Sequence, residues 1–331
     1  MHLKVRKKNG EEIRNKLLKM DALDNMRRVQ SDDEYIYFPL KKKMVLPSTT
    51  IVEKEGLAKK HKPRSLRESL EGRLPDELMN NLPKSFDLIG DIALLEIPAP
   101  LLNKKTIIGD ALLNSFKNIK VVARKKTLIK TRYRTREVEV LAGENRTKTT
   151  HREHGCIYLV DIKSAYFSPR LSHERMRVAE QVSEGERVLV MFAGVGPYAI
   201  LIAKKRNPKK VVAVELNPEA AEYMKKNVAL NKVKVDVIEG DVRDITPKLG
   251  LFDRIIMPLP KDAGDFLDVT LPALDEGGTV HYYDFAADET ESKKKLDNKT
   301  KKLGYKIKIL DSVKCGSYSP NLYRTCVDFK L

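Results

Sequence analysis

After about residue 161, apolar strand segments alternate with helical segments, and this alternation limits the fold more than any other feature of the chain. The expected strands are residues 187–192, 211–216, 235–239, 254–257 and 278–285. Such alternation predicts an α/β fold with a doubly wound, mostly parallel sheet, whose ligands bind at the carboxyl ends of the strands. Two further strands, 306–314 and 323–329, have no helix between them, so we expect the last one to insert antiparallel.

A glycine turn follows the first of these strands. Gly194 and Gly196 stand in Ala-Gly-Val-Gly-Pro, and Glu215 ends the second strand 21 residues after Gly194. Glycines let a ligand approach the backbone at a helix N-terminus, and a carboxylate after the second strand can accept hydrogen bonds from ribose hydroxyls. The third glycine of a dinucleotide-binding turn is absent, which favours S-adenosylmethionine over NAD. An NAD-dependent enzyme is the less favoured alternative.

Two further positions lie at the carboxyl ends of strands. Asp241 follows the third strand, where an adenine amino group would need an acceptor; a helix N-cap is the competing interpretation. The fourth strand ends in Met-Pro-Leu-Pro-Lys, with Pro258 where enzymes that methylate nitrogen commonly place Asn or Asp. Proline can offer only a carbonyl at this position.

The chain is basic, and most of the excess charge lies in its first half. Its 331 residues carry a net charge of +17. Residues 1–150 hold 33 basic and 20 acidic side chains, whereas the remainder is nearly balanced. This distribution predicts that the first half binds a polyanion. A Lys-rich surface of the kind found in heat-stable proteins is the alternative.

One segment of the first half is basic without interruption. Between Lys117 and Arg136 there are nine basic residues and no acidic one. Its last four cations alternate with Thr or Tyr, so a β-strand would place them on one face, where a phosphate backbone could bind. These RNA-binding candidates are Lys130, Arg132, Arg134 and Arg136. A solvated edge strand, charged against aggregation, is the alternative.

Composition and pattern divide the chain into four parts. We expect a small N-terminal module over 1–58, a charged linker over 59–84, a basic middle module over 85–160 and the α/β sheet over 161–331. Within them the pattern predicts helices near 10–26 and over 218–231, two short strands around Gly90 and a strand over 154–161. Three scattered cysteines support neither a disulfide framework nor a zinc site, so we expect thiols in a reducing cytoplasm and no metal. No apolar run reaches membrane-spanning length and no signal peptide is evident, so we expect neither secretion nor membrane insertion.

Several motifs together carry a specific resemblance. They are AGENRT (142–147), YFSPRL (166–171), FAGVGP (192–197), VELNP (214–218) and EGDVRD (239–244). With them the chain resembles the archaeal and eukaryotic tRNA (guanine-N1)-methyltransferases, which modify the guanosine at position 37. The resemblance implies a class I (Rossmann-like) S-adenosylmethionine-dependent methyltransferase sheet with two smaller N-terminal α+β RNA-binding domains. It also implies tRNA as the partner and a monomer.

The resemblance also assigns roles to residues. Glu174 matches the general base that takes the N1 proton, and Arg134 the cation that stabilises charge developing on O6. Tyr166 falls in the active-site segment, and Pro258 in the target-base motif. The implied cofactor contacts are Arg175, Phe192, Gly194, Gly196, Glu215, Leu216, Asp241 and Val242. The alternatives are an exposed helical pair for Glu174 and Arg175, and a simple phosphate contact for Arg134.

This chemistry agrees with what the reaction requires. Protonated guanine N1 is a poor nucleophile, so a base must remove its proton while a cation stabilises the charge on O6. The family usually has Asn in place of Pro258, and wyosine-pathway members that depart here also methylate C7 of 4-demethylwyosine. We therefore expect a bifunctional position-37 methyltransferase. The alternatives are a monofunctional N1 enzyme, an aminocarboxypropyl transferase and a non-catalytic tRNA-binding protein.

Overall fold

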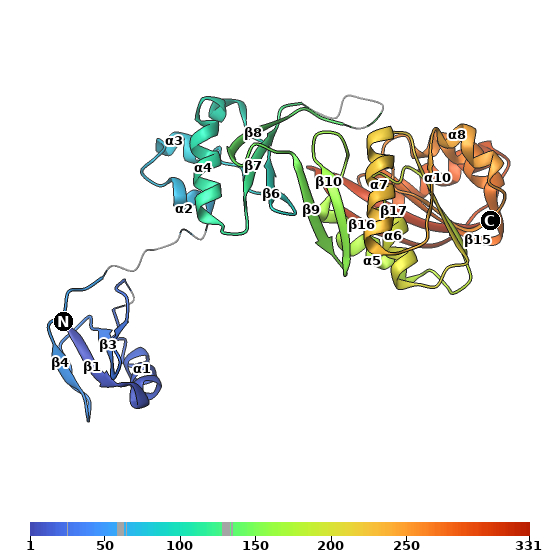
Figure 1. The fold of residues 1–331 in the computed structure, drawn as a ribbon. Coiled ribbons are helices and arrows are strands. Elements are labelled where there is room, and N and C mark those ends of the chain that lie inside the picture. Colours follow the sequence, from blue (N-terminus) through green and yellow to red (C-terminus); the bar gives the residue numbers. More distant parts are fainter. Residues whose placement is uncertain (25, 58–62, 64, 128–132, 134) are drawn as a thin grey trace. The chain divides into compact units, whose positions relative to one another are not determined.

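The computed structural model describes every residue except 25, 58–62, 64, 128–132 and 134 (Figure 1). The chain forms two compact units, Met1–Glu68 and Ser69–Leu331. The division between them falls inside the expected linker. None of the helices in the described part of the chain combines the length and apolar character that crossing a membrane requires.

The first unit is a small antiparallel sheet with one helix packed on it. In the order β2-β3-β1-β4, its strands are β1 (His2–Arg6), β2 (Gln30–Ser31), β3 (Tyr35–Pro39) and β4 (Thr50–Val52). Helix α1 (Gly10–Lys19) buries Ile13 and Leu17 in the same core as Leu3. The sequence predicted this helix to reach residue 26, but the chain turns at Asp21, where φ is +45°.

Helix α2 (Leu66–Leu70) spans the boundary between the two units, and the second unit continues with a short helix, α3 (Asp76–Met79), and a four-stranded sheet. The strands, in sheet order, are β5 (Asp87–Ile89), β6 (Ile92–Leu95), β7 (Val121–Lys125) and β8 (Val138–Gly143). Helix α4 (Lys105–Ser115) connects the parallel strands β6 and β7. The two short strands expected on either side of Gly90 are confirmed.

The expected basic strand falls largely on residues outside the described ones. These are Lys130, Arg132 and Arg134. Arg136 is described, and for it the strand prediction is wrong, because it lies in the connection before β8. At Arg136 the alternation of cations is therefore not by itself a strand signal, because apolar residues that would bury one face are missing from it.

A hairpin joins the middle sheet to the main sheet. Strands β9 (Lys148–Glu153) and β10 (Cys156–Asp161) pair across a two-residue turn, in which His154 and Gly155 both have positive φ. Positive φ at both positions gives the backbone twist that matches paired strands. The sequence predicted β10 but not β9, which is polar along most of its length.

The main sheet has seven strands in the order β13-β12-β11-β14-β15-β17-β16. They are β11 (Arg187–Val190), β12 (Lys210–Glu215), β13 (Asp236–Glu239), β14 (Phe252–Met257), β15 (Leu274–Ala286), β16 (Lys308–Ser319) and β17 (Leu322–Lys330). The first five in sheet order are parallel, and β17 inserts antiparallel between β15 and β16. This confirms both the doubly wound sheet and the antiparallel final strand.

Helices cover both faces of this sheet. One face packs against α5 (Ser172–Glu180), α6 (Pro197–Lys205) and α7 (Pro218–Asn231), and the other against α8 (Val242–Ile245), α9 (Leu267–Thr270) and α10 (Glu289–Lys302). The period of two along each strand decides which side chain serves which core: Val188 and Val190 face the first, and Leu189 the second. The carboxyl ends of the parallel strands therefore stay open to a ligand.

Candidate active site

The glycine turn lies where β11 ends and α6 begins. Gly194 and Gly196 have φ of +58° and +87°, and Pro197 occupies the first turn of α6. A Cβ atom added to Gly196 would come within 2.8 Å of the Met224 side chain, so this position needs glycine. At Gly194 the nearest atom to such a Cβ would be the Tyr166 carbonyl oxygen at 3.5 Å. The turn is thus close to the expected active-site segment.

Glu215 connects this turn to the end of β12. Its Oε2 accepts a hydrogen bond from the Gly194 amide at 2.6 Å, and its Oε1 one from the Asn217 amide at 2.8 Å. A carboxylate whose two oxygens both accept from backbone amides is held in one orientation. The carboxylate is therefore fixed beside the turn, and it suits the ribose hydroxyls of an adenosine.

The other expected cofactor positions surround the same edge of the sheet. Asp241 caps α8, because its Oδ1 accepts from the Arg243 amide at 2.9 Å, so the N-cap interpretation holds. Val242 is buried beneath it, and Leu216 is half-buried after β12. The Phe192 ring packs edge-on against Phe266, with centroids 4.9 Å apart.

Arg175 lies in the interior and binds other protein groups. It is 2% exposed, and its Nε and Nη2 atoms donate to the two carboxylate oxygens of Glu153, both at 2.6 Å. Nη1 and Nη2 also donate to the Ser168 carbonyl at 3.1 Å. Burial opposes ionisation of Glu153, but hydrogen bonds from His151 and Arg175 prevail and lower its pKa to about 2. Arg175 therefore ties α5 to the β9–β10 hairpin.

Glu174 is also buried, at 4% exposure in the first turn of α5. Arg177 donates to both of its oxygens, with Nε–Oε2 at 2.7 Å and Nη2–Oε1 at 2.8 Å. The Tyr283 hydroxyl donates to Oε1 at 2.6 Å. The alternative of an exposed helical pair for Glu174 and Arg175 is therefore wrong, because both side chains lie in the interior.

Tyr166 and Pro258 complete the described part of the expected site. The Tyr166 hydroxyl accepts from Arg324 Nη2 at 3.2 Å. Pro258 is half-buried directly after β14, in a tight turn closed by the Leu259 amide donating to the Met257 carbonyl at 2.8 Å. Arg134, the expected partner of O6, lies outside the described residues.

Sequence reasoning missed the partners of Glu174. Tyr283 lies on β15 and Arg177 one helical turn after Glu174, and Asp328 on β17 binds Arg177 in turn. The available signal was in β15, where the polar residues His281 and Tyr283 stand two positions apart, on one face of the strand, and both are buried. Polar residues at inward-facing strand positions indicate a buried hydrogen-bond network.

The strand order, the glycine turn and the carboxylate at the end of β12 define a class I methyltransferase fold, whose cofactor is S-adenosylmethionine. The chain belongs to the TRM5/TYW2 methyltransferase family. The TRM5/TYW2 methyltransferase domain matches residues 149–309, the TYW2 N-terminal domain residues 66–147, and the tRNA methyltransferase 5 N-terminal domain residues 3–45. The expected family and cofactor are thereby confirmed.

Individual relatives match along the whole chain. The tRNA (guanine(37)-N(1))-methyltransferase Trm5b of Pyrococcus abyssi is 40% identical over 99% of this chain and 98% of its own length. Its crystal structure has a TM-score of 0.79, with 99% of this chain and 98% of that one covered. The structure of a complex of aTrm5 and tRNALeu has a TM-score of 0.88 at 35% identity, covering 100% of this chain and 99% of that one.

Proposed function

We propose that this protein transfers a methyl group from S-adenosylmethionine to N1 of the guanosine at position 37 of tRNA. The observation that carries the proposal is the end-to-end match to a relative of that named activity, at 40% identity. A tRNA partner is supported by the similarity to the aTrm5–tRNALeu complex and by the basic first half of the chain. We also propose the division at 58, 84 and 160 as the domain organisation.

The described residues fit the cofactor. Gly194 and Gly196 keep the turn free of side chains, and Glu215 is held in place to accept from a ribose. Phe192, Leu216, Asp241 and Val242 would surround the adenosine at the same edge of the sheet. The cofactor supplies an electrophilic methyl group on a sulfonium, and the protein has to supply a nucleophile without its proton.

Glu174 is our candidate for the base that removes the N1 proton. Its Oε1 accepts hydrogen bonds from Arg177 and Tyr283, and its Oε2 accepts one from Arg177, so the carboxylate is held in one orientation. A purine that reaches it must leave the anticodon-loop stack, at a cost of a few kcal/mol. Arg134 is our candidate for the cation at O6.

Mass spectrometry of position 37 tests the proposal. A tRNA transcript with guanosine at position 37 is incubated with the protein and S-adenosylmethionine, then digested and analysed. We expect a gain of about 14 daltons on that guanosine, and none in a transcript with adenosine at position 37. A gain of about 101 daltons would identify an aminocarboxypropyl transferase, the activity of a Methanocaldococcus jannaschii relative that is 35% identical over 62% of this chain. Binding of tRNA without any gain in mass, and without cofactor binding in a titration, would identify a non-catalytic tRNA-binding protein.

A second activity, methylation of C7 of 4-demethylwyosine, is favoured by Pro258. Replacement of the usual Asn by proline removes a side-chain amide from the base pocket and suits a larger, flatter base. Nanoarchaeum equitans has a relative named for both activities, which is 30% identical over 66% of this chain. The test compares methyl transfer to tRNA carrying guanosine or 4-demethylwyosine. Methyl transfer to guanosine alone would contradict the proposal of a second activity.

A further inference from the structure

The buried side of Glu174 faces a continuous network of charged and polar side chains. Five elements contribute to it, namely α5, α6, β14, β15 and β17, together with the connection before β11. From one end to the other its members are Glu186, Arg254, His281, Asp328, Arg177, Glu174, Tyr283 and Tyr198. Buried ionised groups are costly unless each is paired, and every link here is a direct hydrogen bond.

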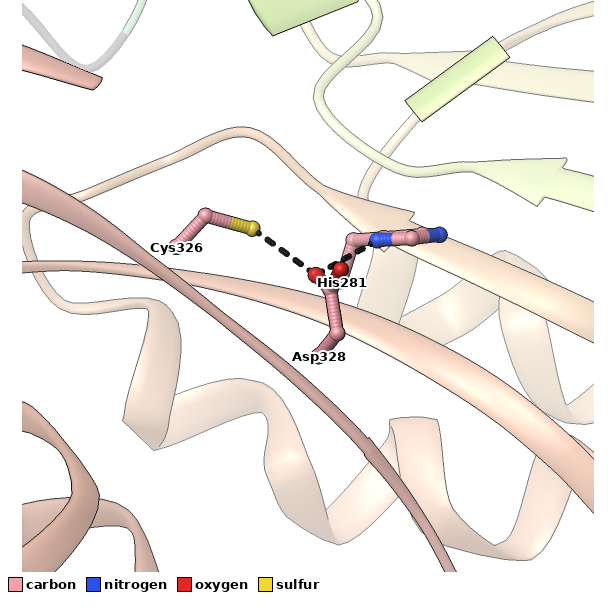
Figure 2. Close-up of side chains that lie close together, drawn as sticks. All are labelled: His281, Cys326 and Asp328. Atoms are coloured by element: carbon pink, nitrogen blue, oxygen red, sulfur yellow. Dashed lines mark hydrogen bonds and ion pairs between the residues drawn. The ribbon is translucent and has the colours of Figure 1, made fainter. Parts of the chain in front are cut away.

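Figure 2 shows the centre of this network, where His281, Cys326 and Asp328 lie together. His281 Nδ1 and Asp328 Oδ1 are 2.7 Å apart, and the Cys326 thiol donates to Oδ1 at 3.2 Å. Arg254 Nη1 lies 2.9 Å from His281 Nε2. Because a guanidinium can only donate, Nε2 is the acceptor, so the ring is neutral and Nδ1 donates to Asp328.

These three residue types also form metal sites, but this geometry opposes one. Two guanidinium groups contact the cluster, Arg254 at His281 and Arg177 at Asp328 Oδ2, which is 2.6 Å from Arg177 Nη1. Gln181 also donates to Oδ2 at 2.9 Å. A cation would have to displace these donors and lie beside two positive charges. The cluster is better explained as the anchor of Arg177.

Arg177 connects Asp328 to Glu174, because it binds both carboxylates. Its guanidinium binds Glu174 along one edge, and along the other it binds Asp328 at 2.6 and 3.3 Å. A planar guanidinium that is bound bidentately on two edges has little rotational freedom. Burial opposes ionisation of Asp328, but hydrogen bonds from His281 and Arg177 prevail and hold its pKa well below the usual range. The anchor therefore keeps its negative charge.

Tyr283 restrains Glu174 from the sheet side. Its hydroxyl donates to Glu174 and accepts from Tyr198 at 3.0 Å. Tyr198 is the second residue of α6, directly after the glycine turn. The same chain of bonds therefore links the candidate base to the element that begins the cofactor site.

We propose that Arg177, Asp328, His281 and Tyr283 are positioning residues that fix the Glu174 carboxylate relative to the cofactor turn. The proposal rests on the proposed function. Catalytic groups must be held to within about 0.5 Å, and a buried carboxylate on a helix needs partners on more than one side to reach that precision. Arg177 and Tyr283 supply them from α5 and β15.

Tyr283→Phe is the main test, with Tyr282→Phe as the matched control. Tyr282 is the neighbouring buried tyrosine of β15 and faces the opposite core, so its change removes the same atom away from Glu174. At saturating tRNA and cofactor, we expect the single-turnover rate of Y283F to fall about tenfold, with unchanged cofactor affinity. The rate of Y282F should remain that of the wild type.

A comparison of binding with rate separates positioning from general structural damage. The groups facing Glu174 are Arg177, Tyr283 and Cys315, whose thiol pKa is raised by burial and then by the Glu174 charge. Misplacement of the carboxylate alone should slow the single-turnover rate of Y283F and leave its affinities for cofactor and tRNA unchanged. General structural damage would weaken these affinities together with the rate.

Arg177→Lys is the second variant, in case Y283F does not fold. Lysine keeps the charge but cannot bind both carboxylates bidentately, so we expect a loss of at least tenfold in rate. A wild-type rate in both variants would overturn the positioning proposal alone. A wild-type protein that does not methylate guanosine would overturn the proposed function, and the positioning proposal with it.

Discussion

Glu174 has two roles, because it is the candidate base and also a buried partner of Arg177. In Glu174→Gln, the amide cannot take a proton, so we expect N1 methylation to slow by about 10²-fold or more. Cofactor affinity should stay nearly unchanged, because Gly194 and Glu215 are untouched. Single-turnover kinetics and cofactor titration check the two quantities separately. Equal losses in both would make Glu174 a structural residue.

The lowered pKa of Glu153 predicts how the stability of the protein depends on pH. Its folded-state pKa of about 2 is below the ordinary 4.5, so its contribution to stability is present above pH 4.5 and is lost as the pH falls through about 2. A shift of this size corresponds to about 3 kcal/mol at neutral pH. Urea unfolding near pH 6 and near pH 3 should show a smaller loss with pH in Glu153→Gln than in the wild type.

Glu96→Gln is the control for this measurement. The Glu96 side chain is 74% exposed beside Lys125, so its ion pair should contribute little to stability. The variant should follow the wild-type pH dependence. A wild-type slope in Glu153→Gln would mean that the Arg175–Glu153 pair is not what makes folding sensitive to acid.

At the scale of elements, α7 holds the β9–β10 hairpin through side-chain amides. Asn227 Oδ1 accepts from the Leu159 amide at 2.7 Å, and Nδ2 donates to the carbonyls of Leu159 and Val195 at 3.1 Å. One helical turn later, Asn231 binds the Ile157 amide and carbonyl in the same way. These two side-chain amides bind backbone groups at the edge of β10, which a neighbouring strand would otherwise have to bind.

Asn227→Leu should therefore destabilise the second unit. It leaves three backbone groups without their partners in a fully buried position, which we expect to cost about 3 kcal/mol or more. Urea unfolding measures the loss, and Leu230→Ala, at an exposed position of the same helix, should change stability by less than about 1 kcal/mol. Equal stability of the two variants would show that β10 does not depend on α7.

The elements that the sequence predicted are those with a strong local pattern. The strands of the main sheet alternate or are continuously apolar, and α7 begins at Pro218 after the Asn217 cap, as its pattern indicates. Helix α5 was missed because its buried face is partly charged: the inward residues are Glu174, Arg175, Val178 and Ala179. Their spacing is that of one helical face, but hydrophobicity alone does not show it.

The candidate site could be predicted only in part for a related reason. Gly194 and Glu215 are set by the local geometry of strand ends, which sequence spacing reports directly. The contacts of Glu174 with Tyr283, and of Arg177 with Asp328, join residues 109 and 151 positions apart. The order of the strands in the sheet determines such contacts, and the insertion of β17 beside β15 brings Asp328 to Arg177.

At the scale of the molecule, part of the basic charge is compensated internally. In the described part of the basic segment, Arg124 pairs with Glu139 at 2.6 Å and Lys125 with Asp87 at 3.1 Å. These acidic residues come from elsewhere in the sequence, so the run of basic residues by itself suggests a stronger positive electrostatic field than the folded protein has. The remaining excess still favours a polyanion over a neutral partner.

We therefore expect the affinity for tRNA to fall steeply with salt, by a factor on the order of 10² or more between about 50 and 200 mM, as counterions are released on binding. Filter binding or fluorescence anisotropy across that range measures the slope. S-adenosylmethionine affinity, measured in the same buffers, is the control and should change little. A flat response for tRNA would contradict a phosphate-binding role for the first half of the chain.

The insertion of β17 between β15 and β16 also has a consequence for synthesis. Glu174 and Arg177 leave the ribosome with α5, but Asp328, which anchors them, follows 151 residues after Arg177. At roughly 5–20 residues per second, that delay lasts on the order of 10 s or more. The first unit and the middle sheet can form meanwhile, so a nascent chain can complete the basic half that we propose to bind tRNA before it gains an aligned base.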